Sequence, residues 1–152
     1  MLRALDFNVT TVSPYWFLSR YSKILRSESP AFFLAQYLTE LSMLDLKMLR
    51  FKPSQIAGGA LYLANRLLKI PAPWPSFITQ HSGYSHSQVK EVALEQYLLY
   101  QKVEGNKQHE ALKKKFSLSR FGEVAKLAFE QRPRSRREDI STSATSTHKS
   151  TV

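Results

Sequence analysis

The sequence has no cysteine and few glycines, and both shortages narrow its possible functions. Without cysteine the chain can form neither disulfide bonds nor thiolate metal sites. Only 5 glycines occur in 152 residues, and no Walker, dinucleotide or Gly-x-Ser-x-Gly fingerprint is present. No apolar run approaches the roughly 20 residues of a transmembrane helix, and the N-terminus lacks the apolar stretch of a signal peptide. We therefore expect no phosphate-cradling loop, no membrane partner and no leader sequence.

Residues in a catalytic or metal-binding pattern are missing as well. The 4 histidines show no ligand spacing with a third donor, although His81 and His86 are close in sequence. Asp45 has no second acid or nucleophile beside it, so we interpret it as a local hydrogen-bonding residue at a helix corner. We expect no enzyme activity, no catalytic residue, no metal and no cofactor.

Acidic residues are scarce, with 12 Asp and Glu against 22 Lys and Arg, for a net charge of +10. Clusters at Lys113–Lys115 and Arg132–Arg137 raise nucleic-acid binding as an alternative function. No helix has the turn and polar recognition face of a helix-turn-helix, so we favour solvated surface for both clusters and no nucleic-acid role. The second cluster surrounds Ser135, a candidate phosphorylation site, and is also compatible with a nuclear import signal.

What the chain does contain is a globular composition followed by a polar tail. Hydrophobic residues make up 43% and aromatic residues 12%, enough for one core in a chain of this length. From Arg132 the sequence becomes rich in Arg, Ser and Thr, and Ile140 is its one large aliphatic residue before the terminal valine. We predict one domain over residues 1–131 and a disordered basic tail over residues 132–152.

Apolar residues at steps of three and four predict an all-α, five-helix domain. Ser-Pro pairs and Pro53 mark helix starts, because proline suits the first helical turn. Residues 1–12 are expected to be extended. The predicted helices run over 14–25, from Ser29-Pro30 to about 49, over 53–68, and from after Ser85 or Ser87 to about 102. A short helix or turn with two aromatic anchors is expected at 74–84, and two shorter helices near 110–115 and 120–129. The second helix should bury Leu44 and Met48, and the helix that ends near 102 should bury Val89, Val92, Ala93, Tyr97 and Tyr100.

Small residues concentrate in the third predicted helix, which we expect at the centre of the core. Ala57, Ala60 and Ala64 fall on one face of this helix. Gly58 and Gly59 each cost a helix interior roughly 1 kcal/mol relative to alanine. Close approach of a neighbouring helix is our explanation for these two glycines.

The most specific pattern runs from Tyr37 to Leu63 and reads YLTELSMLDLKMLRFKPSQIAGGALYL. It closely resembles the second cyclin fold of mitotic A/B-type cyclins, where YLxELSLLDYxML is followed by FxPSxxAAAALxLA. Upstream, LDFNVTTVSPYWFLSRYSK is similar to the first strand and helix of that fold. Downstream, FITQHSGYS and KKKFSLSRFGEVAKL are similar to its TLxHYTGY and KYSxxKFxxVS motifs. The resemblance covers about residues 1–131.

The resemblance implies part of a mitotic cyclin, a regulatory subunit that binds and activates a cyclin-dependent kinase at G2/M, in nucleus and cytoplasm. In that family a first cyclin fold supplies most of the kinase contact, and this sequence opens where the two folds join. Kinase binding by this chain alone is therefore expected to be weak or absent. The alternatives are a truncated isoform or a stand-alone interaction adaptor without kinase activation, and a transcription- or RNA-associated relative.

An absent first fold would leave an apolar inter-fold surface uncovered. Leu2, Leu5 and Phe7 lie where the family's linker joins its folds, so they are our candidate inter-fold or partner contacts. We expect this surface to promote self-association.

Overall fold

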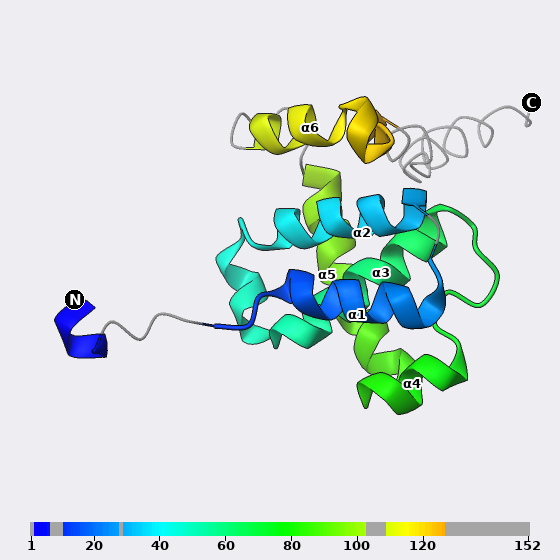
Figure 1. Ribbon diagram of the computed structural model, residues 1–152, viewed down its shortest axis with the longest axis horizontal. Coiled ribbons are helices and arrows are strands. Elements are labelled where there is room, and N and C mark those ends of the chain that lie inside the picture. The colour runs from blue at the N-terminus through cyan, green and yellow to red at the C-terminus, as the bar shows by residue number, and fades with distance from the viewer. Residues whose placement is uncertain (1, 7–10, 28, 103–108, 127–152) are drawn as a thin grey trace, which may run out of the picture.

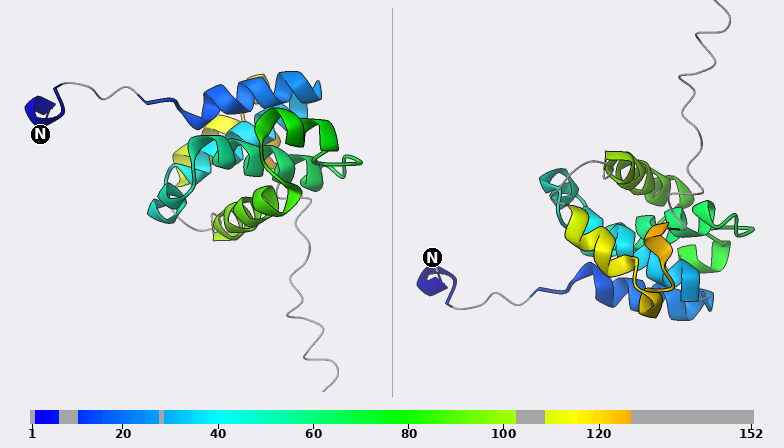
Figure 2. Two further views of the ribbon diagram at one scale, coloured as in Figure 1. Left: turned by 90° about the horizontal axis from the view of Figure 1, so that it is seen from below. Right: turned by 90° about the horizontal axis from the view of Figure 1, so that it is seen from above.

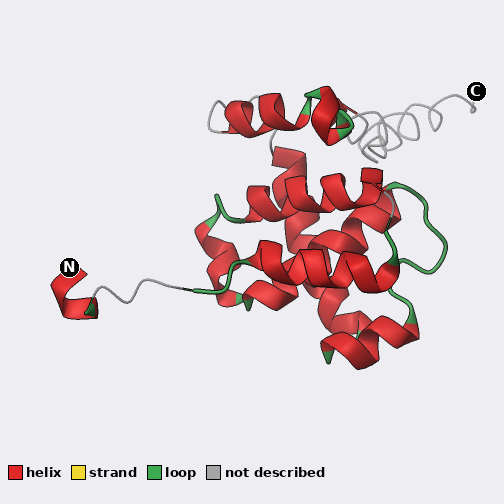
Figure 3. Cartoon of the chain, viewed as in Figure 1, coloured by secondary structure: helices red, strands yellow, loops and turns green. Residues whose placement is uncertain are grey.

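The computed structural model describes residues 2–6, 11–27, 29–102 and 109–126, and within these ranges no strand occurs (Figure 3). The predicted all-α class is confirmed for this part of the chain. The elements in chain order are η1 (Leu2–Leu5), α1 (Pro14–Leu25), α2 (Ser29–Ser42), η2 (Leu46–Arg50), α3 (Pro53–Leu67), α4 (Ser76–Ser82), α5 (His86–Lys102), α6 (Glu110–Phe116) and η4 (Ser119–Phe121), where η denotes a 3₁₀ helix.

The central helix is α3, which packs against α1, α2 and α5. Helices α1 and α5 lie on opposite sides of the molecule, with α2 and α3 between them (Figures 1 and 2). All residues from Ile56 to Asn65 are buried. The predicted position of this helix at the core is therefore confirmed.

The two glycines of α3 lie against bulky side chains of neighbouring segments. A Cβ atom on Gly59 would be 2.7 Å from Gln96 Oε1 and 2.8 Å from Val92 Cγ1, both on α5. A Cβ atom on Gly58 would be 3.3 Å from Trp74 Cη2. Close packing of a neighbouring helix, predicted from the sequence, is thus confirmed at Gly59, whereas Gly58 faces mainly the Trp74 ring in the segment before α4.

The segment between α3 and α5 is held by two aromatic residues, as predicted. Trp74 is buried, and its Nε1 donates to the Tyr84 carbonyl oxygen at 3.3 Å. The Tyr84 hydroxyl lies 2.6 Å from Ser54 Oγ at the start of α3. These contacts fix the turn that carries the chain through α4 into α5.

Two predicted boundaries are wrong. Residues 1–12 are not uniformly extended, because Leu2–Leu5 forms η1. The Asp6 amide, directly after η1, donates to the Arg3 carbonyl oxygen at 3.3 Å. The helix predicted over 29–49 ends at Ser42 and is followed by a turn and by η2. As a result, Leu44 is exposed rather than on the buried face.

The described residues contain more helical segments than the predicted five-helix class implies. The short helix predicted near 110–115 is confirmed as α6, whereas η1 and η2 were not predicted. The helix predicted from about 120 begins with η4, and residues 124–126 are helical. The predicted tail and the last residues of the predicted domain lie outside the described residues.

Candidate interaction surfaces

The corner between α2 and α3 is built by hydrogen bonds that end one helix and start another. Ser42 Oγ donates to the Leu38 carbonyl oxygen at 2.7 Å, a bond to the preceding turn that favours bending or ending a helix. Asp45 Oδ1 accepts from the Lys47 amide at 2.8 Å and so caps η2. The predicted local role of Asp45 is confirmed.

Breaking the helix at this corner turns four apolar side chains toward solvent. We call them the corner surface: Met43, Leu44, Leu46 and Leu49. Their exposed fractions range from 54% to 83%, and Leu46 is the most exposed. Met43 and Leu44 also line a hollow of about 450 Å³ that they share with α6. Exposed apolar patches larger than a few hundred Å² usually mark interaction sites, so the corner surface is a candidate for one.

Contacts with the rest of the domain hold the corner in place. Met48, between the exposed leucines of η2, is 2% exposed and packs with Ile56 and Val92. Arg50 at the end of η2 forms an ion pair with Glu95 of α5 at 2.8 Å. The exposed side chains therefore belong to an anchored segment.

A buried glutamine joins the same corner to α5 and α3. Gln96 is 1% exposed, and its Nε2 donates to Ser42 Oγ and to the Ile56 carbonyl oxygen, both at 3.0 Å. Ser42 in turn donates to Leu38. This chain of hydrogen bonds fixes where α2 ends relative to the start of α3.

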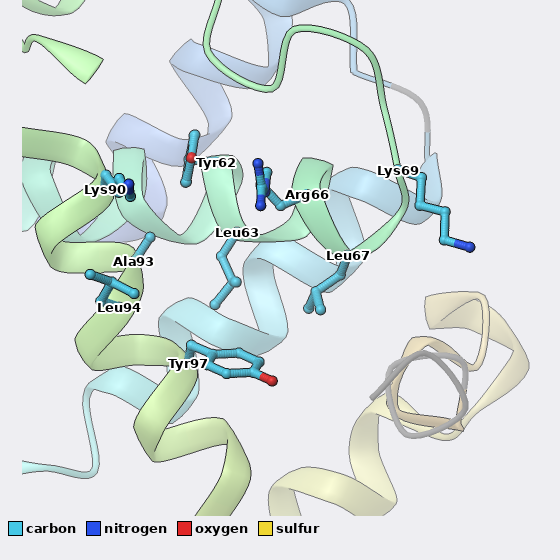
Figure 4. A pocket seen from close by; sticks show the side chains of 9 residues that line it. All are labelled: Tyr62, Leu63, Arg66, Leu67, Lys69, Lys90, Ala93, Leu94 and Tyr97. Carbon is cyan, nitrogen blue, oxygen red and sulfur yellow. The ribbon is translucent and has the colours of Figure 1, made fainter. Parts of the chain in front are cut away.

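A second surface feature is a groove between α3 and α5, with a volume of about 430 Å³ (Figure 4). We call it the α3–α5 groove. Leu63 and Leu67 point from α3 toward the groove, opposite Tyr97 of α5, which was predicted to be buried and is only half-buried. The lining residues are Tyr62, Leu63, Arg66, Leu67, Lys69, Lys90, Ala93, Leu94 and Tyr97.

The charged residues that line this groove all have one sign. Arg66, Lys69 and Lys90 are exposed, and no carboxylate is among the lining residues. Within the described ranges none of these three cations forms an ion pair. The groove combines an apolar floor with a positively charged rim.

The candidate contacts predicted from the sequence are not tested by the described residues. Leu2 and Leu5 lie in η1, drawn apart from the helical bundle in Figure 1, and their side-chain environment is not described. Phe7 and the candidate phosphosite Ser135 lie outside the described residues. Their roles stay predictions.

Two features of these surfaces escaped the sequence prediction. Leu44 and Met48 matched the apolar spacing of a longer helix, which assigned both to its buried face, and of the two only Met48 is buried. The acidic residue Asp45, followed by Leu46, was a cap signal that could have revealed the break. Gln96 lies seven residues after buried Val89, on the same face of α5. Because its side chain is polar, it was not predicted to be buried.

The described residues contain neither a candidate metal site nor a membrane-spanning helix. No group of three or more His, Cys, Asp or Glu there could hold a metal ion. Neither is any helix in those ranges long and apolar enough to cross a bilayer.

Residues 12–130 match the protein family described as cyclin, C-terminal domain. Among similar proteins, Cyclin-B2-2 of Arabidopsis thaliana is 34% identical over 82% of this chain. The G2/mitotic-specific cyclin cdc13 of Schizosaccharomyces pombe is 36% identical over 80% of it. The G2/mitotic-specific cyclin-A of Patella vulgata is 31% identical over 84% of it.

These matches cover only part of each relative. The aligned region is 29% of the Arabidopsis protein, 24% of the yeast protein and 30% of the Patella protein. The chain thus spans less than a third of the length of these relatives.

Proposed function

We propose that this chain is part of a mitotic cyclin. The premise is that the chain belongs to the family of cyclin C-terminal domains. It would serve as a regulatory subunit of a cyclin-dependent kinase in control of the G2/M transition. The observation that carries this proposal is the similarity of residues 12–130 to that family, together with relatives that are mitotic cyclins of both A and B type.

Such a subunit does no chemistry itself. It binds the active conformation of a kinase more tightly than the inactive one and thereby shifts the equilibrium between them. Moving that equilibrium from 1:99 to 99:1 needs a preference of about 10⁴-fold, so a rigid binding surface matters. The anchored corner and the buried α3 helix would supply rigidity to this part of the cyclin.

We further propose that the corner surface packs against an adjoining folded unit. Residues 11–13 lead into α1 at the same end of the bundle as the corner, because α1 and α2 run antiparallel (Figure 1). A unit joined ahead of α1 would therefore be close to Leu46 and Leu49. Leu2, Leu5 and Phe7 stay candidates for the same contact.

A chimeric cyclin tests the proposal. Residues 12–130 of this chain replace the matching region of the S. pombe cyclin cdc13, and the chimera is purified with a cyclin-dependent kinase. We expect stimulated phosphorylation of a histone-type substrate within about tenfold of the parent cyclin, which corresponds to about 1.4 kcal/mol. The 152-residue chain alone should give no stimulation, because the family's main kinase contact lies in the first fold.

The matched control is the same chimera with Leu46→Glu and Leu49→Glu, which should assemble less well if the corner is an inter-fold contact. A chimera that folds but neither binds nor activates the kinase would contradict the proposal and favour the adaptor alternative. Stimulation by the 152-residue chain alone would refute the expectation that a first fold is needed. Localisation to nucleus and cytoplasm is part of the same proposal and can be followed with a fluorescent fusion of the full chain.

A further inference from the structure

The α3–α5 groove has a composition suited to one kind of ligand. Its floor includes Leu63, Leu67 and Ala93, which offer apolar contact but few hydrogen bonds. Three cations line the same groove. Arg66 lies in the last turn of α3, Lys69 follows the end of α3, and Lys90 lies near the start of α5. A ligand lying here would meet apolar side chains along its middle and positive charge around it.

The three cations of this groove differ from Arg50 and Lys115 in having no ion-pair partner within the described residues. Arg50 pairs with Glu95 at 2.8 Å, and Lys115 pairs with Glu40 at 2.7 Å, so each joins two helical segments. Arg66, Lys69 and Lys90 have no such partner within the described residues. Their charge is therefore available to a ligand that brings carboxylates.

The apolar surface also continues along α5 beyond the groove. Leu94 is 55% exposed, and Leu98, one turn further, is 49% exposed. Residues four apart on a helix lie on the same face, so the two leucines form a short line beside the groove. From Lys90 through Leu94 to Leu98 this face of α5 extends about 12 Å at 1.5 Å per residue, so a partner segment of about two helical turns would match it.

We propose that the α3–α5 groove binds an acidic amphipathic segment of a partner protein. Bulky apolar side chains of that segment occupy the floor over Leu63, Leu67 and Leu94. Its Asp and Glu side chains face Arg66, Lys69 and Lys90. The arginine-rich tail of this chain is a poor occupant because its charge has the same sign. A nucleic acid could meet the cations but offers no bulky aliphatic side chains for Leu63, Leu67 and Leu94.

Peptide display against the full 152-residue chain tests this proposal without any kinase, so its outcome is independent of the proposed cyclin function. The probe is a random library of 16-residue peptides. We expect enriched peptides to carry apolar residues at steps of three and four with interspersed Asp and Glu. Leu94→Asp should weaken their binding at least tenfold, and Lys90→Glu severalfold. Raising the salt from 50 to 300 mM should also weaken binding, because it screens the charge pairs.

The matched control is Leu46→Asp, which alters an exposed leucine of the corner surface and should bind the peptides as the unaltered chain does. Thermal midpoints of all three variants should equal that of the unaltered chain, since the altered side chains are exposed. Absence of enriched peptides, enrichment without acidic residues, or loss of binding only in Leu46→Asp would overturn the proposal. So would at least tenfold tighter binding after removal of residues 132–152, because the tail would then be the natural occupant.

Discussion

At the scale of single residues, replacing Gly59 or Gly58 by alanine has two opposing effects on stability: a gain in helix preference and a cost from overpacking. Alanine favours a helix interior by roughly 1 kcal/mol over glycine, and this gain applies at both positions. At Gly59 the new Cβ would lie 2.8 Å from Val92 Cγ1 on a buried, branched side chain. We expect Gly59→Ala to lower the free energy of unfolding by about 1–3 kcal/mol through overpacking.

Gly58→Ala is the control for this prediction. Its nearest contact is 3.3 Å to the edge of Trp74, so a shift of a few tenths of an ångström accommodates it. We expect a stability within about 1 kcal/mol of the unaltered protein, because the helix preference offsets the shift. Urea denaturation measures both variants, and equal midpoints for them would show that α3 and α5 are not in close contact.

Tyr21 gives the domain a specific response to high pH. Burial raises the pKa of its hydroxyl to about 12, with a further contribution from Tyr84 and an opposing one from Arg20. Because the folded-state pKa exceeds the unfolded value of about 10, the unfolded state loses its proton first. This stabilisation is complete below pH 10 and is lost as the pH rises toward 12.

We expect Tyr21→Phe to remove this part of the pH dependence. By pH 11 the unaltered protein should have lost about 1.4 kcal/mol more stability, relative to pH 8, than the variant. Urea denaturation of both proteins at the two pH values measures the difference. Parallel losses in the two proteins would mean that the Tyr21 hydroxyl titrates alike in folded and unfolded chains.

Gln96 illustrates what sequence patterns can and cannot reveal about single residues. The period of α5 correctly placed Val89, Val92 and Tyr100 in the core. Gln96 occupies the same stripe, but its partners Ser42 and the Ile56 carbonyl come from segments 54 and 40 residues away. Helical spacing carries no information on such distant hydrogen bonds, so it could not predict that this glutamine is buried.

At the scale of elements, α6 contributes one fully buried side chain, Phe116, to the core. Phe116 is fully buried, with its ring centroid 5.4 Å from that of Tyr37 and 4.8 Å from that of Phe121. The ion pair between Lys115 and Glu40 also joins α6 to α2, but both side chains are about a third exposed. Exposed pairs contribute about 0–1 kcal/mol, whereas a buried Phe→Ala change costs about 3–5 kcal/mol.

We therefore expect Phe116→Ala to release α6, and Glu40→Gln to leave it docked. Amide hydrogen exchange reports this directly, because α6 amides should exchange much faster in Phe116→Ala while those of α3 keep more of their protection. Glu40→Gln should change α6 protection by less than about 1 kcal/mol. Similar effects of the two substitutions would mean that electrostatics, not aromatic packing, holds this helix.

The α2–η2 corner sets the limit of prediction for elements. Pro53 correctly predicted the start of α3, because proline restricts the backbone wherever it occurs. The end of α2 at Ser42 depends instead on a side-chain bond to Leu38 and on the cap by Asp45. Apolar spacing continued through this point, so it indicated one long helix and concealed the corner surface.

At the scale of the whole molecule, apolar exposure and net charge act against each other. The four side chains of the corner surface are each more than half exposed, and they belong to an anchored segment rather than to a loose terminus. Their burial between two molecules would be favourable at roughly 25 cal/mol per Å² of apolar area. A charge of +10 on each copy opposes association, but at 0.15 M salt its screening length is only about 8 Å.

We therefore expect the chain to self-associate weakly when no partner covers the corner. A dissociation constant near 100 μM requires only about −5.5 kcal/mol, which a modest apolar contact can supply after the cost of association is met. Sedimentation at rising protein concentration and physiological salt measures it, and Leu46→Glu with Leu49→Glu should abolish it without changing the thermal midpoint. Raising the salt should strengthen association of the unaltered chain, because repulsion is screened while apolar burial is not. If the chain is strictly monomeric up to about 100 μM, the corner surface is too small to drive pairing. If the glutamate variant associates as strongly as the unaltered chain, the contact lies elsewhere.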